Sequence, residues 1–198
     1  MFIQVIRGRV TNAEGLREQL DRWVSELAPG ADGWLGSTGG VTDDGHLMLG
    51  ARFASPEAAR RNSARPEQDT WWQATSRHLD DVVFHDCPEV DVYKRGGSDA
   101  AGFVQVIQGR VTDKDAYRAE IARLDREGEP AGRASLIGGV VAWDGNHFTE
   151  FVYFTSEQQA RQEELAPGHS VALEQRWSVS QDPTYLDLRQ PWLVSPGT

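Results

Sequence analysis

Hydrophobic and polar residues follow two periodicities along this chain, and their alternation predicts an order of strands and helices. Residues 2–10 are rich in β-branched side chains, which is typical of a strand. The next segment spaces its large apolar residues three or four positions apart, as a helix with one buried face requires. Thr11 or Asn12 caps this helix at its start, and Pro29-Gly30 marks its end. The apolar residues on the predicted face are Leu16, Leu20, Trp23 and Leu27.

The rest of the first half predicts two more strands, a helix and a final strand. Residues 34–42 and 46–54 form a hairpin around the turn Asp43-Asp44-Gly45. Ser55-Pro56-Glu57 begins a helix, because it supplies a capping hydroxyl, a proline at the first helical position and an acidic first turn. Residues 82–93 form a last strand that is interrupted at Pro88. This order, βαββαβ, is that of a ferredoxin-like unit.

The first strand occurs a second time, 101 residues later. Residues 2–12 return as residues 103–113, with eight of the eleven positions identical. A period of this length indicates two copies of a small domain rather than a solenoid unit. The glycine- and serine-containing segment between the copies predicts a flexible linker. We therefore expect a first domain at 1–94, a linker at 95–102 and a second domain at 103–198.

A four-stranded antiparallel sheet with both helices on one face leaves its other face uncovered. Two fused copies can cover each other's free face. The sequence thus predicts an α+β fold in which two tandem ferredoxin-like halves pack their sheets together within one chain. The expected molecule is a monomer with an internal pseudo-dimer, and a homodimer of such chains is the alternative.

Composition narrows the possible partners. The formal net charge of −10 argues against a phosphate-binding surface, since proteins that bind nucleic acid need a basic stripe. No stretch approaches the roughly 20 apolar residues that cross a bilayer. The single cysteine, Cys87, cannot form an internal disulfide and fits a reducing compartment. We expect an acidic, cytoplasmic protein that binds neither nucleic acid nor membrane.

Three segments carry a resemblance to a known family: the strand pattern of residues 2–12, RFASPEAA at 52–59 and PEVDVY at 88–93. Together they resemble the dimeric α+β barrel superfamily, and in particular its antibiotic-biosynthesis-monooxygenase-like domains. The resemblance covers nearly all of both halves and implies two ferredoxin-like domains paired sheet to sheet, here within one chain. The superfamily includes cofactor-independent monooxygenases, haem-degrading enzymes, chlorite-dismutase-like haem proteins and domains without known chemistry.

Strand alternation decides which side chains face the helices and which face the interior between the sheets. In the third strand of each half, one face is apolar and suits the helices, so we assign the opposite face, with Arg52 and Tyr153, to the interior. We also place Gln4 and Gln105 there, because a few polar groups among apolar ones are typical of a small-molecule pocket. The alternative is that both glutamines hydrogen-bond across their sheets and that Arg52 pairs with an acidic group.

Further candidates lie in the second helical region of the first half. Trp71-Trp72 occurs where the second copy has Ala172-Leu173. One tryptophan is expected in the core, and Trp72 either closes the interior or stacks on a planar ligand. Asn62 lies in the same region. The resemblance to cofactor-free monooxygenases implies that Asn62, Trp72 and Tyr153 position a phenol and its carbanion before oxygen attacks.

The histidines and the cysteine form no metal-binding motif. No His-x-His or His-x-x-x-His pair exists, so we expect no metal ligand. His46 and His147 follow tight turns, where a solvated side chain is the simpler interpretation. The resemblance to the chlorite-dismutase-like branch makes His169 the candidate axial ligand of a haem. Cys87 has no evident activating base and is interpreted as structural.

Three functions remain open at this point. The first is a cofactor-independent monooxygenase for a hydrophobic quinol or polycyclic aromatic, in which Tyr153 and Arg52 deprotonate a phenol and stabilise its anion. The second is a non-catalytic barrel that binds a hydrophobic small molecule, and the third is a haem protein. Because the two copies differ at several of these positions, we expect one dominant pocket in the second half, lined by Tyr153, Gln105 and Phe151.

Overall fold

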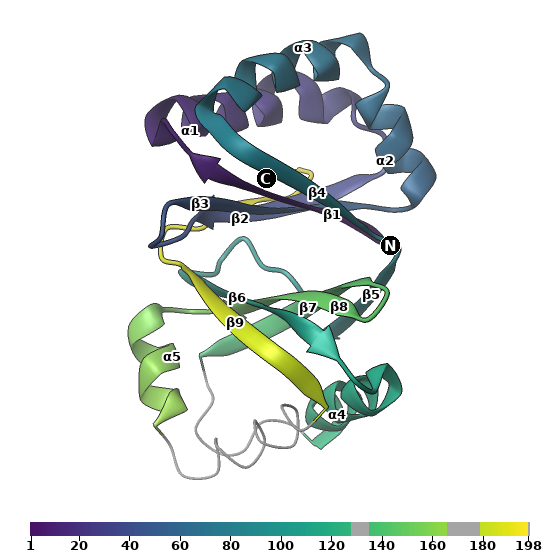
Figure 1. The fold of residues 1–198 in the computed structure, drawn as a ribbon, viewed down its shortest axis with the longest axis vertical. Coiled ribbons are helices and arrows are strands. Elements are labelled where there is room, and N and C mark those ends of the chain that lie inside the picture. Colours follow the sequence, from purple (N-terminus) through teal and green to yellow (C-terminus); the bar gives the residue numbers. More distant parts are fainter. Residues whose placement is uncertain (128–134, 166–178, 198) are drawn as a thin grey trace. The chain divides into compact units, whose positions relative to one another are not determined.

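The computed structural model of the chain describes residues 1–127, 135–165 and 179–197 (Figure 1). The chain divides into two compact units. Each unit has an antiparallel five-stranded sheet with its helices on one face, which is the predicted α+β arrangement of ferredoxin-like halves. None of the helices in the described ranges is long and apolar enough to cross a membrane.

The first unit follows the predicted order of a strand, a helix, two strands, a helical region and a strand. Its first helix continues into a π-helical turn, Trp23–Leu27, and a 3-10 turn, Ala28–Gly30. The elements are β1 (Phe2–Val10), α1 (Ala13–Arg22), β2 (Trp34–Val41), β3 (His46–Phe53), α2 (Pro56–Ser63), α3 (Pro66–Thr75) and β4 (Leu79–Cys87).

Side-chain caps begin the first and second helices where the sequence predicts them. The Asn12 side-chain oxygen accepts a hydrogen bond from the Gly15 amide at 3.1 Å. The Ser55 hydroxyl accepts one from the Ala58 amide at 3.2 Å. These bonds satisfy N–H groups that the first turn of a helix leaves without a partner within the helix.

The second unit repeats the order after one additional strand. Its first helix, α4, is a single α-helix, whereas α1 ends in the π-helical turn. The elements are β5 (Glu89–Lys94), β6 (Phe103–Val111), α4 (Lys114–Glu127), β7 (Leu136–Asp144), β8 (His147–Phe154), α5 (Glu157–Glu164) and β9 (Ser180–Leu188), followed by β10 (Trp192–Val194).

The two units exchange their fifth strands. The first sheet has the strand order β10-β2-β3-β1-β4 and the second has β5-β7-β8-β6-β9. Accordingly, the first unit contains Met1–Glu89 together with Trp192–Thr198, and the second contains Val90–Pro191. The single strand predicted at 82–93 is therefore wrong. It is two strands in different sheets, separated at Pro88, which has no N–H to continue a ladder.

The central strand pairs of the two sheets, β1 with β3 and β6 with β8, have the same register once residue numbers are shifted by 101. Phe2 lies opposite Phe53 in the first sheet, and Phe103 lies opposite Phe154 in the second. A bulge interrupts β2 and β7 at equivalent places, where each pairs with the end of β3 or β8. In the first sheet this bulge follows Trp34 and brings Gly36 into the ladder.

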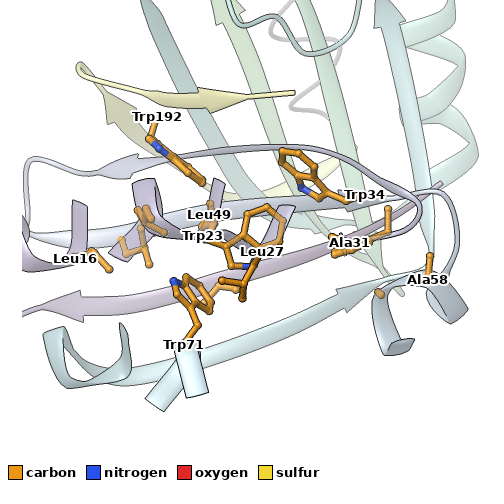
Figure 2. Close-up of a cluster of buried hydrophobic side chains, with 14 of the residues drawn as sticks. Leu16, Trp23, Leu27, Ala31, Trp34, Leu49, Ala58, Trp71 and Trp192 are labelled. Carbon is orange, nitrogen blue, oxygen red and sulfur yellow. The ribbon is translucent and has the colours of Figure 1, made fainter. Parts of the chain in front are cut away.

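Four tryptophans dominate the core between the helices and the sheet of the first unit (Figure 2). Trp23 meets Trp34 edge to face, with ring centroids 4.9 Å apart, and Trp192 enters from the exchanged strand. An indole buries a large apolar area but carries one N–H that needs an acceptor. The acceptors are Gln68 Oε1 for Trp23, Ser37 Oγ for Trp34, the Gln19 carbonyl for Trp71 and Asp21 Oδ1 for Trp192, at 2.7, 3.1, 2.7 and 3.2 Å.

Cross-strand pairing fixes the two faces of each sheet, because residues directly opposite each other project to the same side. Phe2 and Ile6 belong to the core beneath the helices of the first unit. The intervening residues Ile3 and Val5, together with Arg52 opposite Ile3, therefore lie on the face away from the helices. That the two sheets face each other stays a prediction.

Candidate functional site

Gln4 and Gln105 do not share a face with Arg52 and Tyr153, so the predicted interior is wrong in this respect. Gln4 lies opposite Ala51 on the face that carries the helices, and Gln105 occupies the equivalent place in the second sheet. The reason is visible in strand alternation. Gln4 is two residues from Phe2 and from Ile6, which are both core residues beneath the helices.

Each glutamine instead hydrogen-bonds across its sheet, which confirms the alternative for the glutamines. Gln4 Nε2 donates to Asp86 Oδ1 at 2.9 Å. Gln105 Nε2 donates to Asp187 Oδ1 at 3.3 Å. Asp187 also forms an ion pair with Arg161. These contacts account for the glutamines as structural residues, and we assign them no ligand.

Asn62 lies in the first unit among the contacts between helices. Its side chain is buried, and its Oδ1 accepts a hydrogen bond from Arg65 Nη1 at 3.0 Å. The same Nη1 donates to the Leu27 carbonyl at 3.0 Å. Asn62 therefore helps to tie the end of α2 to the end of the π-helical turn, and it does not line the pocket described below.

Trp72 contributes to an aromatic surface at the edge of the first sheet. Its ring lies 5.9 Å from that of Trp71 and 5.1 Å from that of Phe84, measured between centroids. Trp71 is the core tryptophan of the pair. Phe84 is 45% exposed on β4, an edge strand. Trp72 is thus a half-buried residue that packs against Phe84, and it does not line the pocket described below.

Tyr153 and Phe151 lie on the face of the second sheet that points away from its helices. Tyr153 pairs with Val104 and Phe151 with Val106. Because Gln105 projects to the opposite face, these three residues cannot line one pocket as predicted. Tyr153 and Phe151 are neighbours on one apolar face, and Tyr153 supplies a phenol there.

Arg52 lies on the face of the first sheet away from the helices, beside the end of the exchanged strand β10. Gly36 lies opposite Arg52 and has a φ of +122°. A β-carbon at Gly36 would lie 2.4 Å from Arg52 Nη2, 2.7 Å from the Val194 carbonyl oxygen and 3.1 Å from Ser195 Oγ. Glycine at this position therefore allows the guanidinium to approach the end of β10.

The guanidinium of Arg52 is incompletely satisfied. Its Nε is buried and has no hydrogen-bond partner within the part of the chain that the structure describes. A buried donor without an acceptor costs free energy and calls for an explanation. An anionic or carbonyl-bearing ligand would supply the acceptor.

A pocket of about 370 Å³ lies in the first unit, and its wall includes Val194 and Ser195, which lie close to Gly36 as the Arg52 guanidinium does. The volume falls in the range of small-molecule sites. Apolar side chains make up most of the lining, with one indole and one hydroxyl among them. The lining residues are Val24, Ala28, Pro29, Ala31, Trp34, Val194, Ser195, Pro196 and Gly197.

Three irregular segments create this pocket. The π-helical turn carries Val24, and the 3-10 turn after it carries Ala28 and Pro29. The tail after β10 completes the wall. Single π-helical turns within helices occur frequently at functional sites. Sequence reasoning missed the pocket because its walls come from opposite ends of the chain and depend on strand exchange. The local signal was Pro29-Gly30 after a helix face that contains Trp23.

The histidines make no metal centre in the described part of the chain. No group of three or more His, Cys, Asp or Glu residues there could hold a metal ion. His46 Nδ1 lies 3.2 Å from Asp44 Oδ2 beside the hairpin turn. The Thr42 hydroxyl donates a hydrogen bond to the Asp44 carboxylate. This bond is the main reason why the pKa of the Asp44 carboxyl lies below its usual value. His169 lies outside the described residues.

Comparisons with known proteins find similar folds among solved structures. No protein-family model and no curated protein matches the sequence. A candidate monooxygenase from Lactobacillus acidophilus NCFM is 16% identical, with coverage of 99% of this chain and 97% of that one and a TM-score of 0.73. A second, from Fusobacterium nucleatum subsp. nucleatum, is 10% identical over 99% and 94% of the two chains, with a TM-score of 0.74.

A third solved structure is that of an anthrone oxidase-like protein. It is 12% identical, with coverage of 100% of this chain and 94% of that one and a TM-score of 0.67. The three solved structures, two of candidate monooxygenases and one of an anthrone oxidase-like protein, thus have a fold similar to that of this chain. This likeness extends over both units and concerns the fold.

Proposed function

We propose that the protein is a cofactor-independent monooxygenase that oxidises a hydrophobic aromatic molecule of the quinol or anthrone type. One observation carries the proposal: a pocket with Trp34 and Ser195 in its wall lies near Arg52, whose buried Nε has no hydrogen-bond partner in the described residues. The fold shared with an anthrone oxidase-like protein and with two candidate monooxygenases supports the reaction class.

The pocket suits a flat aromatic molecule. Trp34 offers an indole for ring contact, and Val24 and Ala31 offer aliphatic surface. Contact between aromatic rings contributes about 0.5–1.5 kcal/mol beyond the area that it buries. The wall at Ser195 supplies a hydroxyl, and both this hydroxyl and the Arg52 guanidinium lie near Gly36. We therefore place the oxygen substituent of the substrate at the Ser195 end.

The proposed reaction needs no external reductant, because the substrate supplies the electrons. An anthrone-type methylene next to the aromatic rings loses a proton and leaves an anion delocalised onto the ring oxygen. A positive group near that oxygen stabilises the anion, and we assign this role to Arg52, whose guanidinium lies near Gly36 and the end of β10. Molecular oxygen then reacts at the carbon. One oxygen atom stays as the new carbonyl, and the other leaves as water with the two hydrogens of the methylene.

Tyr153 is the second candidate for acid–base chemistry in the same proposal. A phenol next to Phe151 on an apolar sheet face can hold or release a proton for an aromatic substrate. Arg52 and Tyr153 belong to different units. Variants of the two residues therefore report which unit carries the reaction.

The test is oxygen consumption with an anthrone-type substrate, combined with tryptophan fluorescence to detect binding. Ala28→Trp places a large ring in the pocket, whereas Ala74→Trp puts the same ring on α3 and serves as the control. We expect oxygen uptake above the uncatalysed rate, lost in Ala28→Trp and kept in Ala74→Trp. Saturable quenching without uptake would favour a binding protein, and a Soret band after addition of haemin would favour a haem protein. Absence of uptake with every substrate of this class would overturn the proposal.

A further inference from the structure

The two units differ in a coordinated way at three positions related by the repeat offset of 101. In the first unit the three side chains are aliphatic and pack in or against the core between helices and sheet. In the second unit the equivalent positions carry two phenols and a carboxyl group. The equivalent pairs are Leu16 and Tyr117, Leu49 and Glu150, and Val194 and Tyr93.

The three polar side chains of the second unit meet in its core. The Tyr93 hydroxyl donates to Glu150 Oε1 at 2.7 Å, and the Tyr117 hydroxyl donates to Glu150 Oε2 at 2.9 Å. Each carboxylate oxygen thus has a phenol of its own. Glu150 and Tyr117 are both 0% exposed, and Tyr93 is 8% exposed. Their surroundings are apolar, with Val141 and Trp143 in the same cluster.

The side chains on the two exchanged strands are matched to the sheets that receive them. Tyr93 lies on β5, which pairs in the second sheet, and Val194 lies on β10, which pairs in the first. We call Tyr117 with Glu150 the polar socket, and Leu16 with Leu49 the apolar socket. Each strand brings the side chain that its socket can accommodate.

We propose that the two sockets determine which fifth strand each sheet accepts. Tyr93 at the place of Val194 would enter the core of the first unit, where Leu16 and Leu49 stand in place of Tyr117 and Glu150 and offer its hydroxyl no acceptor. Val194 in the polar socket would remove the donor that Glu150 Oε1 has in Tyr93. Mismatched pairing is therefore unfavourable in both sheets.

Selection by the sockets has a consequence for assembly. If the β5 strands of two chains instead joined the first sheet of each other's chain, each Tyr93 would enter an apolar socket. The sockets therefore favour exchange between the unlike units of one chain over exchange between like units of two chains. The polar socket shares no residue with the pocket, whereas Val194 also lines it, so the inference is tested by unfolding and assembly rather than by oxygen uptake.

The main test exchanges strands and sockets separately in the full-length chain. The strand variant is Tyr93→Val with Val194→Tyr. The six-position variant adds Leu16→Tyr, Leu49→Glu, Tyr117→Leu and Glu150→Leu, which restores the match in both units. We expect the strand variant to raise the unfolding equilibrium constant roughly ten- to a hundredfold in urea. The six-position variant should recover most of that loss of stability. An unfolding equilibrium constant as high as that of the strand variant would overturn the proposal.

A second measurement keeps the inference testable if the six-position variant does not fold. Tyr93→Val, Tyr117→Leu and Glu150→Leu together make both sockets apolar, so the sockets no longer distinguish β5 from β10. After refolding at high protein concentration, light scattering should detect a larger fraction of oligomers than for the natural chain. Val152→Ala, which trims the same core, is the control for lost stability and should leave that fraction unchanged. An equal oligomer fraction in the triple variant and in the natural chain would contradict selection.

Discussion

Gln4 Nε2 donates a hydrogen bond to Asp86 Oδ1 at 2.9 Å, from strand β1 to the edge strand β4. The equivalent bond in the second unit joins Gln105 to Asp187 at 3.3 Å. The two bonds lie in different electrostatic surroundings. Asp187 is paired with Arg161 and is 3.6 Å from Arg189, and its side chain is only 16% exposed.

This difference predicts unequal effects of the same substitution. Asp187→Ala removes an ion pair and a hydrogen bond from a partly buried site, so we expect the free energy of unfolding to fall by about 1–3 kcal/mol. Asp86→Ala removes an exposed hydrogen bond and should cost less than about 1 kcal/mol. Urea unfolding of both variants measures the difference. A larger loss for Asp86→Ala would show that the network around Arg161 adds nothing.

Gly36 is predicted to be intolerant of a side chain for two independent reasons. Its φ of +122° is unfavourable for any residue with a β-carbon, and that carbon would lie 2.7 Å from the Val194 carbonyl oxygen. We expect Gly36→Ala to lower the free energy of unfolding by about 1–3 kcal/mol. Gly45→Ala is the matched control, because Gly45 has a φ of +80° but no atom within 4 Å of the added carbon.

The comparison of these two glycine variants separates backbone strain from crowding. Both substitutions strain the backbone, but only Gly36→Ala displaces the Arg52 guanidinium. Thermal unfolding should show a larger loss for Gly36→Ala, and oxygen uptake should fall in that variant alone. Equal losses would mean that strain accounts for the whole effect.

We predict that Asp44 makes the free energy of unfolding depend on pH in the acid range. The hydrogen bond from Thr42 is the main cause that lowers the pKa of Asp44 in the folded chain. A carboxyl with a lowered folded pKa contributes stability above its unfolded pKa, and that contribution is lost as the pH falls through the folded value. Thr42→Val should raise the pKa of Asp44 toward its ordinary value, as measured by NMR titration. An unchanged titration would identify His46 as the controlling partner.

Local pattern was sufficient for the βαββαβ order within each unit. Helical spacing of Leu16, Leu20 and Trp23 identified a helix whose three residues all lie in the core of the first unit. Strand alternation also placed Arg52 on the face away from the helices. Gln4 was misplaced, although its neighbours Phe2 and Ile6 carried the correct signal, because a polar residue between core residues was interpreted as facing a pocket.

Strand exchange and the pocket depend on pairing between distant segments, which local pattern does not contain. Pro88 marked an interruption, but nothing near it indicates that the next strand joins another sheet. The pocket needs the tail after Val194 to lie beside β2, and this follows from the pairing of β10. The polar socket had a sequence signal in Leu49 and Glu150, which are equivalent in the repeat. Its meaning required the contacts with two tyrosines.

The last prediction decides which unit carries the proposed reaction. The sequence alone favoured Tyr153, whereas the pocket and the unsatisfied Nε favour Arg52. We expect Arg52→Leu to lower kcat/KM for an anthrone-type substrate by about a hundredfold, since a group that stabilises the developing anion is lost. Arg52→Lys keeps the charge and should retain part of the activity.

Tyr153→Phe is the matched variant in the other unit. It removes one hydroxyl and should change the free energy of unfolding by only about 1 kcal/mol. If the pocket in the first unit is the site, oxygen uptake should remain close to that of the natural chain. Loss of uptake in Tyr153→Phe with full activity in Arg52→Leu would move the reaction to the face of the second sheet that carries Phe151 and Tyr153.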